Sequence, residues 1–252
     1  MISRRSVLGG LALVAASRPL LAKDPERLNV AANEGDVALA RYAAEGEGKR
    51  ASVVVLHGAR GVELRLHAYE RYANALSAQG IDAYLIRYYS AADDRALAKI
   101  TTAEGRQAYD TGRYDTWTPR VSSVVTAILK RPDSNGRLGL LGFSLGGYVA
   151  AATASRDDRV SALAVLYGGM PDSIAPEVKH LPPLLELHGD ADRNVPFARG
   201  EALVKLAKAA GGEAELIAYP GKAHGFDFSD TDPMAADAVG RVVRFFHSRL
   251  QG

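Results

Sequence analysis

The 252-residue chain contains no cysteine, so it has no disulfide, no thiolate metal ligand and no thiol nucleophile. It also lacks a marked excess of either charge, with a formal net charge of +2. Three of its 31 basic residues and none of its 29 acidic residues fall within positions 1–22. A nucleic-acid-binding protein carries a basic patch or stripe. We therefore expect no nucleic-acid partner.

No apolar run reaches the roughly 20 residues that a membrane-spanning helix needs. The chain begins with paired arginines, Arg4 and Arg5, followed by a short apolar run from Val7 to Ala16. This order is typical of a secretory signal, and the arginine pair resembles the twin-arginine type. We predict an export signal over 1–22, a single domain over 23–252 and a periplasmic or secreted location. An ordinary secretory signal or an uncleaved anchor is the alternative.

Short apolar runs rich in β-branched residues alternate with helical patterns. Residues 52–56 form a nearly continuous apolar run, which is typical of a strand buried on both faces. From Leu66 to Ala78, apolar residues recur at helical spacing. Similar patterns predict strands over 81–88, 138–143, 161–167, 184–187 and 213–219, and helices over 121–130, 145–153, 196–210 and 236–249. Such alternation predicts an α/β fold with a mostly parallel sheet and helices on both faces. Residues 25–44 add one or two antiparallel edge strands.

Two connections bear on access to a site. The segment 168–181 is short, which leaves no room there for a large cap domain. The longest irregular stretch is expected from Ala91 to Trp117, and loops of this length are often functional. This stretch either roofs a substrate pocket, with Trp117 in the pocket, or is a surface excursion with a few packed aromatic residues.

The strongest motif follows the predicted strand 138–143. Residues 142–147 read Gly-Phe-Ser-Leu-Gly-Gly, which is the G-x-S-x-G nucleophile elbow in its strand-to-helix context. The glycines let the strand and helix backbones approach closely, and the helix start favours a developing anion. This spacing differs from the dinucleotide fingerprint G-x-G-x-x-G. We predict that Ser144 is a nucleophile.

Backbone donors for an oxyanion are predicted next to this serine. The strand ending at Leu56 runs into His57-Gly58-Ala59-Arg60. A His-Gly pair here resembles the esterase loop that supplies the second oxyanion N–H. The predicted donors are the backbone N–H groups of Ala59 and Leu145. We interpret His57 as structural, and Arg60 either lines the mouth of the site or is simply solvated.

The acid and the base are expected after later strands, in the order Ser, Asp, His. Two acids, Asp190 and Asp192, follow the strand 184–187, and we favour Asp192 because of its spacing to Val195-Pro196. His224 lies after the last strand, in Tyr-Pro-Gly-Lys-Ala-His-Gly-Phe. Phe226 is a candidate pocket residue. No metal-ligand spacing accompanies these residues, and we expect neither a metal nor a cofactor.

Together these motifs resemble the dienelactone hydrolase family of the α/β-hydrolase superfamily, over a match from about Val53 to the end of the chain. Three positions depart from what that resemblance implies. Ser144 stands where true dienelactone hydrolases have a cysteine, Gly58 where they carry a glutamate, and Phe228 where an arginine helps to bind the substrate carboxylate. The dienelactone itself is therefore a doubtful substrate.

The residues and the resemblance imply a serine hydrolase that cleaves a small carboxylic ester or lactone. Its partner would be a small-molecule ester, with no stable membrane span after signal cleavage. Two alternatives stay open. One is a peptidase similar to the catalytic domain of prolyl oligopeptidases, and the other is a catalytically silent binding protein on the same fold, because a fold does not settle function.

Overall fold

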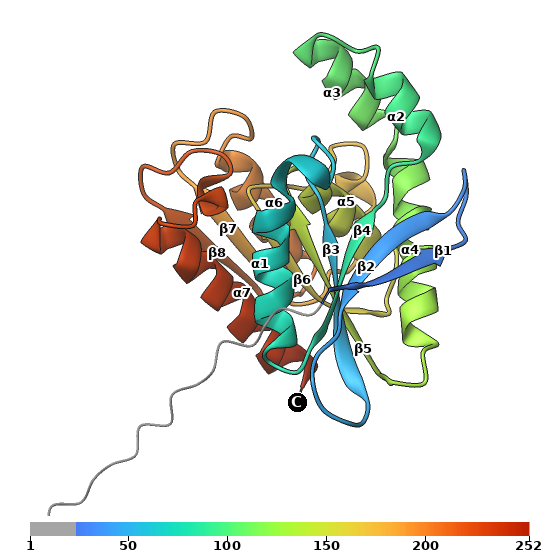
Figure 1. The fold of residues 1–252 in the computed structure, drawn as a ribbon. Helices are drawn as coiled ribbons and strands as arrows, with labels where there is room; N and C mark the ends of the chain where they lie inside the picture. Colours follow the sequence, from blue (N-terminus) through green and yellow to red (C-terminus); the bar gives the residue numbers. More distant parts are fainter. Residues whose placement is uncertain (1–23, 252) are drawn as a thin grey trace, which may run out of the picture.

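The computed structural model describes residues 24–251, and its strands form one eight-stranded sheet (Figure 1). The strand order is β1-β2-β4-β3-β5-β6-β7-β8. The strands are β1 (Glu26–Val30), β2 (Val37–Tyr42), β3 (Arg50–Leu56), β4 (Asp82–Arg87), β5 (Ser134–Phe143), β6 (Val160–Leu166), β7 (Leu184–Gly189) and β8 (Ala214–Tyr219). The predicted export signal lies outside the described residues and stays a prediction.

The sheet is antiparallel at one edge and parallel elsewhere. β1 pairs with β2 and β2 pairs with β4 in antiparallel register, whereas every pair from β4 through β3 to β8 is parallel. The two edge strands confirm the prediction for residues 25–44. The mostly parallel sheet that the alternating pattern predicted is likewise confirmed.

Helices cover both faces of the sheet (Figure 1). One face carries α1 (Leu66–Ser77) and α7 (Pro233–Leu250), and the other carries α4 (Tyr114–Leu129), α5 (Leu145–Ala154) and α6 (Ala198–Ala209). Short 3-10 helices lie at Glu63–Arg65, Ala175–Glu177 and Phe226–Phe228. None of the helices between residues 24 and 251 is both long and apolar enough to cross a lipid bilayer.

Strand β3 shows why the apolar run is continuous. Val53 and Val55 pack into the core beneath α1 and α7, whereas Val54 and Leu56 pack into the core beneath α4 and α5. Successive side chains of a strand point to opposite faces. A central strand with helices on both sides is therefore apolar on both faces, as β3 is from Val53 to Leu56.

The stretch from Ala91 to Trp117 is helical, and the prediction of an irregular segment was wrong. It contains α2 (Ala91–Leu97) and α3 (Ala103–Thr111), and α4 begins at Tyr114 rather than at Val121. Residues at the helix starts account for the difference. The Ser90 side chain accepts a hydrogen bond from the Asp93 N–H while Asp93 accepts one from the Ser90 N–H, and Thr102 caps α3. Such caps stabilise short helices.

Asp93 joins the two ends of this segment. It is fully buried, and its carboxylate accepts hydrogen bonds from Tyr109 Oη (2.7 Å), Arg113 Nε (2.8 Å) and Trp117 Nε1 (3.1 Å). Burial acts to raise the pKa of Asp93, but these hydrogen bonds and those from Ser90 outweigh it, and the pKa lies below its ordinary value. Helices α2 and α3 lie above the carboxyl edge of the sheet (Figure 1).

We predict that Phe246→Ala, on α7, lowers the free energy of unfolding by about 3–5 kcal/mol. Phe246 is fully buried, and a Cβ at Gly139 of β5 would lie 2.4 Å from its ring, so helix and strand are in close contact. Urea unfolding measures the change. The adjacent Phe245→Ala is the control, because Phe245 is only partly buried. Equal losses in the two variants would contradict this account of the packing.

Candidate active site

Ser144, Asp192 and His224 follow the carboxyl ends of three different strands. Ser144 directly follows β5, Asp192 lies in the loop after β7, and His224 lies in the loop after β8. Because β5 to β8 are parallel neighbours, these loops emerge along the same edge of the sheet. Ligand sites of open parallel sheets lie outside this edge.

The turn at Ser144 requires glycine on both sides. Ser144 has φ 54° and ψ −120°, a backbone conformation that L-residues rarely adopt. A Cβ at Gly142 would lie 2.3 Å from the Gly146 carbonyl oxygen. A Cβ at Gly146 would lie 2.4 Å from the carbonyl oxygens of both Leu56 and His57. Only a chain without side chains at these two positions can make the turn, which displays the Ser144 hydroxyl above the sheet.

A continuous chain of hydrogen bonds links the three residues. His224 Nε2 lies 2.9 Å from Ser144 Oγ, and His224 Nδ1 lies 2.7 Å from Asp192 Oδ2. The Asp192 side chain has no exposed surface, whereas the His224 side chain is 18% exposed. A carboxylate at Nδ1 fixes the hydrogen there and leaves Nε2 free to accept the hydrogen of a serine hydroxyl.

The loop after β7 distinguishes the two candidate acids. Oδ1 of Asp192 accepts hydrogen bonds from the backbone N–H groups of Asn194 (2.8 Å) and Val195 (3.0 Å), which leaves Oδ2 directed at His224. Asp190 is exposed, and its carboxylate accepts a hydrogen bond from the Gly221 N–H at 2.6 Å. The structure thus brings Asp192, and not Asp190, to His224.

The predicted oxyanion loop packs against the serine. A Cβ at Gly58 would lie 3.5 Å from Ser144 Cβ. The Gly58 carbonyl accepts hydrogen bonds from the Gly61 N–H (3.1 Å) and from His57 Nδ1 (2.8 Å), so the peptide that carries the Ala59 N–H is fixed in direction. Leu145 is the first residue of α5, where backbone N–H groups have no helical acceptor. Leu145 directly follows Ser144, and Ala59 directly follows the glycine that packs against it; their role as oxyanion donors stays a prediction.

His57 is a buried member of this loop, in keeping with a structural role. Its ring stacks on Tyr88 at 4.2 Å between centroids, and the Tyr88 hydroxyl donates to the His57 carbonyl at 3.1 Å. Burial lowers the pKa of His57 to about 4. The ring is therefore neutral at neutral pH and can donate from Nδ1 to the Gly58 carbonyl.

Comparison with known proteins identifies the family. The sequence model of the dienelactone hydrolase family matches residues 39–250. This chain belongs to that family. The resemblance found in the sequence is thereby confirmed.

Individual relatives of the dienelactone hydrolase family match over shorter stretches. A Methylorubrum extorquens protein, provisionally named carboxymethylenebutenolidase, is 30% identical over 101 residues, which are 36% of this chain and 34% of that protein. An Escherichia coli protein of the same provisional name is 28% identical over 126 residues. The matched regions therefore span less than half of each relative.

Solved structures share the α/β-hydrolase fold. Dienelactone hydrolase from Anabaena variabilis has a TM-score of 0.70 at 19% identity, over 90% of this chain and 100% of that one. Pyrococcus horikoshii acylaminoacyl peptidase has a TM-score of 0.71 at 16% identity, over 90% of this chain and 42% of that one. At these identities the likeness shows the fold alone, and it confirms the fold class predicted from the sequence.

Two departures from the dienelactone hydrolase pattern lie at the site. Glycine at position 58 leaves no side chain on that flank of Ser144. Phe228 lies in the His224 loop, and the Arg65 guanidinium lies 4.8 Å from the centre of its ring. A glutamate at position 58 would place a carboxylate beside Ser144, where this chain has no side chain. At position 228 this chain has an aromatic ring, and the cation beside that ring is Arg65.

Three residues were candidates for the pocket, and the structure places them differently. Arg60 is exposed, directly after Ala59. Phe226 is 8% exposed, and its ring is tilted against the Tyr219 ring with 4.5 Å between the centroids. Trp117 has no exposed surface. The prediction that Trp117 lines the pocket was therefore wrong, because its indole N–H is bound to Asp93 in the core.

The structure adds three buried, hydrogen-bonded residues behind His224 that the sequence analysis missed. The Tyr167 ring meets the His224 ring edge-on at 4.6 Å, and the Tyr167 hydroxyl donates to Asp227 at 2.7 Å. Tyr72 donates to the other oxygen of Asp227 at 2.9 Å. Burial raises the pKa of Asp227. The signal in the sequence was an acid between two aromatic residues, at positions 226–228.

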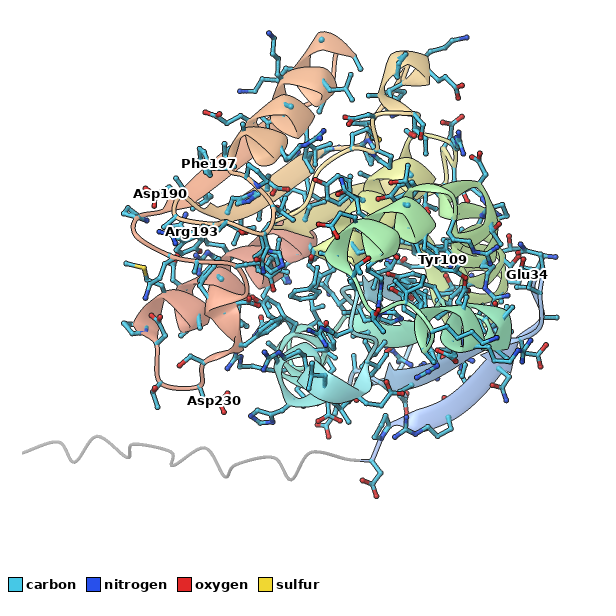
Figure 2. All side chains as sticks on the ribbon, turned by 90° about the horizontal axis from the view of Figure 1, so that it is seen from above. Glu34, Tyr109, Asp190, Arg193, Phe197 and Asp230 are labelled. Carbon is cyan, nitrogen blue, oxygen red and sulfur yellow. The ribbon has the colours of Figure 1, made fainter. Side chains whose placement is uncertain are left out.

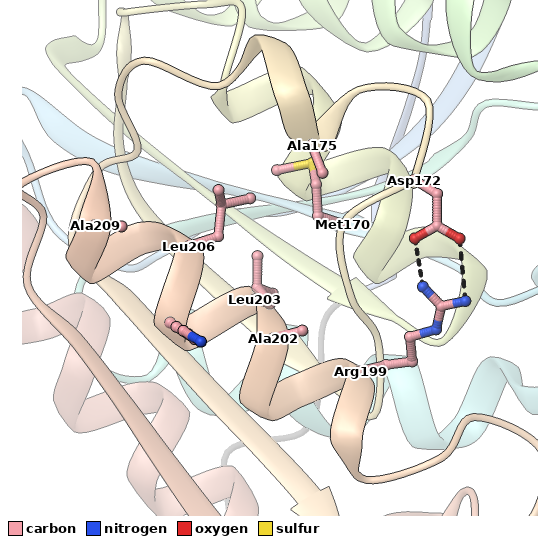
Figure 3. Close-up of a pocket in the computed structure, with 9 residues that line it drawn as sticks. Met170, Asp172, Ala175, Arg199, Ala202, Leu203, Leu206 and Ala209 are labelled. Carbon is pink, nitrogen blue, oxygen red and sulfur yellow. Dashed lines mark hydrogen bonds and ion pairs between the residues drawn. The ribbon is translucent and has the colours of Figure 1, made fainter.

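A surface hollow borders His224 and is lined by Ala191, Arg193, Asn194 and Ala223. Seen from above the carboxyl edge, Arg193 lies on the side opposite Tyr109 of α3 (Figure 2). A second, more apolar hollow lies between α6 and the loop after β6, where Arg199 forms an ion pair with Asp172 (Figure 3). The triad residues do not line this second hollow.

We predict that Gly146→Ala abolishes activity and destabilises the fold, because its Cβ would overlap the backbone of the oxyanion loop. Thermal unfolding together with labelling by a serine-directed probe measures both effects. Gly112→Ala is the control, since Gly112 has φ −77° and a Cβ there would make only ordinary contacts. A Gly146→Ala protein with native stability and labelling would refute the steric argument.

Asp110, at the end of α3, makes the stability of the folded protein depend on pH. Arg106 of α3 donates to the Ala59 carbonyl and to the Tyr89 hydroxyl, and it pairs with Asp110 at 3.3 Å. Burial raises the pKa of Asp110 to about 6, although Arg106 opposes this. A carboxyl whose pKa is higher in the folded state destabilises that state once the pH exceeds the unfolded value, and the full penalty is present above the folded value.

We therefore expect Asp110→Asn to raise the melting temperature at pH 8 and to lose this advantage as the pH falls from about 6 towards 4. Melting curves across this range test it. Asp115→Asn, at an exposed acid paired with Arg156, should change the melting temperature little at any pH. A difference between wild type and Asp110→Asn that stays constant with pH would contradict the assignment.

Proposed function

We propose that this chain is a serine hydrolase that cleaves small carboxylic esters or lactones. The observation that carries the proposal is the hydrogen-bonded chain from Ser144 through His224 to Asp192, at the tip of a strained strand-to-helix turn. Membership of the dienelactone hydrolase family supports an ester as the substrate class. The absence of cysteine assigns the nucleophile to the serine rather than to a thiol.

The proposed reaction has two halves. Ser144 Oγ attacks the acyl carbon while His224 Nε2 takes its proton, and the buried Asp192 carboxylate stabilises the resulting imidazolium. The negative charge on the acyl oxygen is held by the N–H groups of Ala59 and Leu145. His224 then protonates the leaving alcohol. Water, deprotonated by His224, hydrolyses the acyl-enzyme and restores the serine.

Helices α2 and α3, which lie above the carboxyl edge of the sheet and form the roof of the site, support a small substrate. The described residues that rise above the carboxyl edge include two short helices, α2 and α3, rather than a large cap domain (Figure 1). Helix α3 is tied to the oxyanion loop through Arg106, which donates to the Ala59 carbonyl. A roof fixed in this way favours small acyl and alcohol groups.

A peptidase is the second candidate, since the fold matches the acylaminoacyl peptidase with a TM-score of 0.71. The chain covers 42% of that enzyme, and at 16% identity the match concerns the fold alone. Comparing hydrolysis of an ester with hydrolysis of the matching amide separates the two candidates. Ester turnover without amide turnover favours the esterase.

We expect the purified protein to hydrolyse p-nitrophenyl acetate and butyrate, and Ser144→Ala to lose about 10⁴-fold or more in kcat, because the nucleophile acts together with its base. Ser77→Ala, at a surface serine of α1 that hydrogen-bonds within its helix, is the control and should retain activity. Wild type and Ser144→Ala with equal turnover, or no turnover by either, would count against the proposal and favour a peptidase or a silent binding protein.

A further inference from the structure

A buried pair of ionisable residues lies behind the candidate acid. Glu186 and His188 are both on β7, and neither side chain has any exposed surface. His188 Nδ1 lies 2.9 Å from Glu186 Oε1, which also accepts the Gly168 N–H at 3.2 Å. The other oxygen, Oε2, is buried without a hydrogen-bond partner. A buried carboxylate is costly unless it is paired, so this arrangement calls for an explanation.

The far side of the His188 ring faces the triad. His188 Nε2 lies 3.0 Å from the Val195 carbonyl oxygen and 3.5 Å from Asp192 Oδ2, the same oxygen that His224 contacts at 2.7 Å. Asp192 Oδ2 therefore lies between two imidazole rings, one at the surface and one in the core. The Val195 N–H, in turn, donates to Asp192 Oδ1 at 3.0 Å.

These contacts fix how many protons the pair holds. Both atoms facing Nε2 are acceptors, so Nε2 carries a hydrogen. Nδ1 faces a carboxylate oxygen, and this contact also needs a proton between the two atoms. The pair thus holds two protons, one on His188 Nε2 and one between His188 Nδ1 and Glu186 Oε1, which is one more than a neutral imidazole beside a carboxylate would hold. The positively charged side of the pair faces Asp192.

The direction of the pKa shifts agrees with that proton count. Burial raises the pKa of Glu186. Burial acts to lower the pKa of His188, but the hydrogen bond and charge of Glu186 outweigh it and raise that pKa. Asp192 is the other charged group that faces His188. Burial raises the pKa of Tyr148 of α5, and the charges of Glu186 and Asp192 act in the same direction.

Helix α6 closes the pair off from solvent. The Phe197 ring meets the His188 ring edge-on at 5.5 Å. A Cβ at Gly200 would lie 2.7 Å from His188 Nδ1. Because neither side chain has any exposed surface, electrostatic interactions across the pair are stronger than in water.

We infer that Glu186 and His188 are positioning residues for the triad, which hold the Asp192 carboxylate directed at His224 from its core side. The inference rests on the proposed function. His188 acts on Asp192 in two ways, by placing its Nε2–H beside Oδ2 and by fixing the Val195 carbonyl of the turn that supplies N–H groups to Oδ1. Neither residue touches the substrate.

The test uses Glu186→Gln, His188→Gln and the control His247→Gln, which removes an exposed histidine of α7. Each full chain is labelled with a fluorophosphonate, and the second-order rate of Ser144 modification is measured against pH. In wild type this rate rises as His224 loses its proton. Labelling needs no ester substrate, so it depends only on the reactivity of the serine.

Glu186→Gln and His188→Gln should both shift the rise of the labelling rate with pH, the acidic limb of the profile, to higher pH by about half a unit or more. Removing the positive end near Asp192 makes the His224 cation more stable, so a higher pH is needed to deprotonate His224. Glu186→Gln keeps the His188 ring and should retain most of the plateau rate, whereas His188→Gln should also lower the plateau. The control should match wild type.

Thermal unfolding shows whether each variant folds, and Glu186→Gln alone carries the test if His188→Gln does not. Folded variants with the wild-type acidic limb would overturn the inference and leave the proposed function standing. A wild-type protein that is not labelled at Ser144, or a Ser144→Ala protein labelled equally well, would instead overturn the proposed function and the inference with it.

Discussion

The backbone of β5 and the first turn of α5 approach each other more closely than any side chain would allow. A Cβ at Gly142 would lie 2.3 Å from the Gly146 carbonyl oxygen, and a Cβ at Gly146 would lie 2.4 Å from the Leu56 and His57 carbonyl oxygens at the end of β3, so these contacts exist only because both residues are glycine. Ser144 adopts its unusual backbone conformation between them, and its N–H is bound to the Leu166 carbonyl of β6 at 2.9 Å. The parallel sheet thus supplies the restraint that holds the strained turn in place.

Each part of the site has a buried polar partner beneath it. The oxyanion loop is underlain by His57, His224 by Tyr167 and Asp227, and Asp192 by the pair Glu186–His188. Hydrogen-bonded networks of buried polar groups make a site rigid, and in these three supports the buried atoms without a partner are His57 Nε2 and Glu186 Oε2. The three supports come from different strands and loops. The geometry of the triad is therefore set from below by the sheet.

Sequence patterns predicted the features that depend on neighbouring residues. The G-x-S-x-G spacing, the apolar runs and the order of Ser144, Asp192 and His224 are local signals. The helices α2 and α3 have local caps, but their placement above the sheet depends on Asp93, whose partners Tyr109, Arg113 and Trp117 lie 16 to 24 residues away. The same holds for Asp227, which meets Tyr72 across 155 residues of chain. Such pairings arise only after the fold brings distant segments together.

The segment from Ser90 to Trp117, which lies above the sheet, is bound near both of its ends to the Asp93 carboxylate. Ser90, where the segment begins, and Trp117, where it enters the core, both bind Asp93. A loop whose two ends meet is closed already, and lengthening a loop between fixed ends costs little additional free energy. Residues between the two anchors that bind neither Asp93 nor the oxyanion loop can therefore be replaced or extended without moving β4 or α4. Substrate preference in this architecture can diverge within one segment, provided that Arg106 keeps its contact with the Ala59 carbonyl.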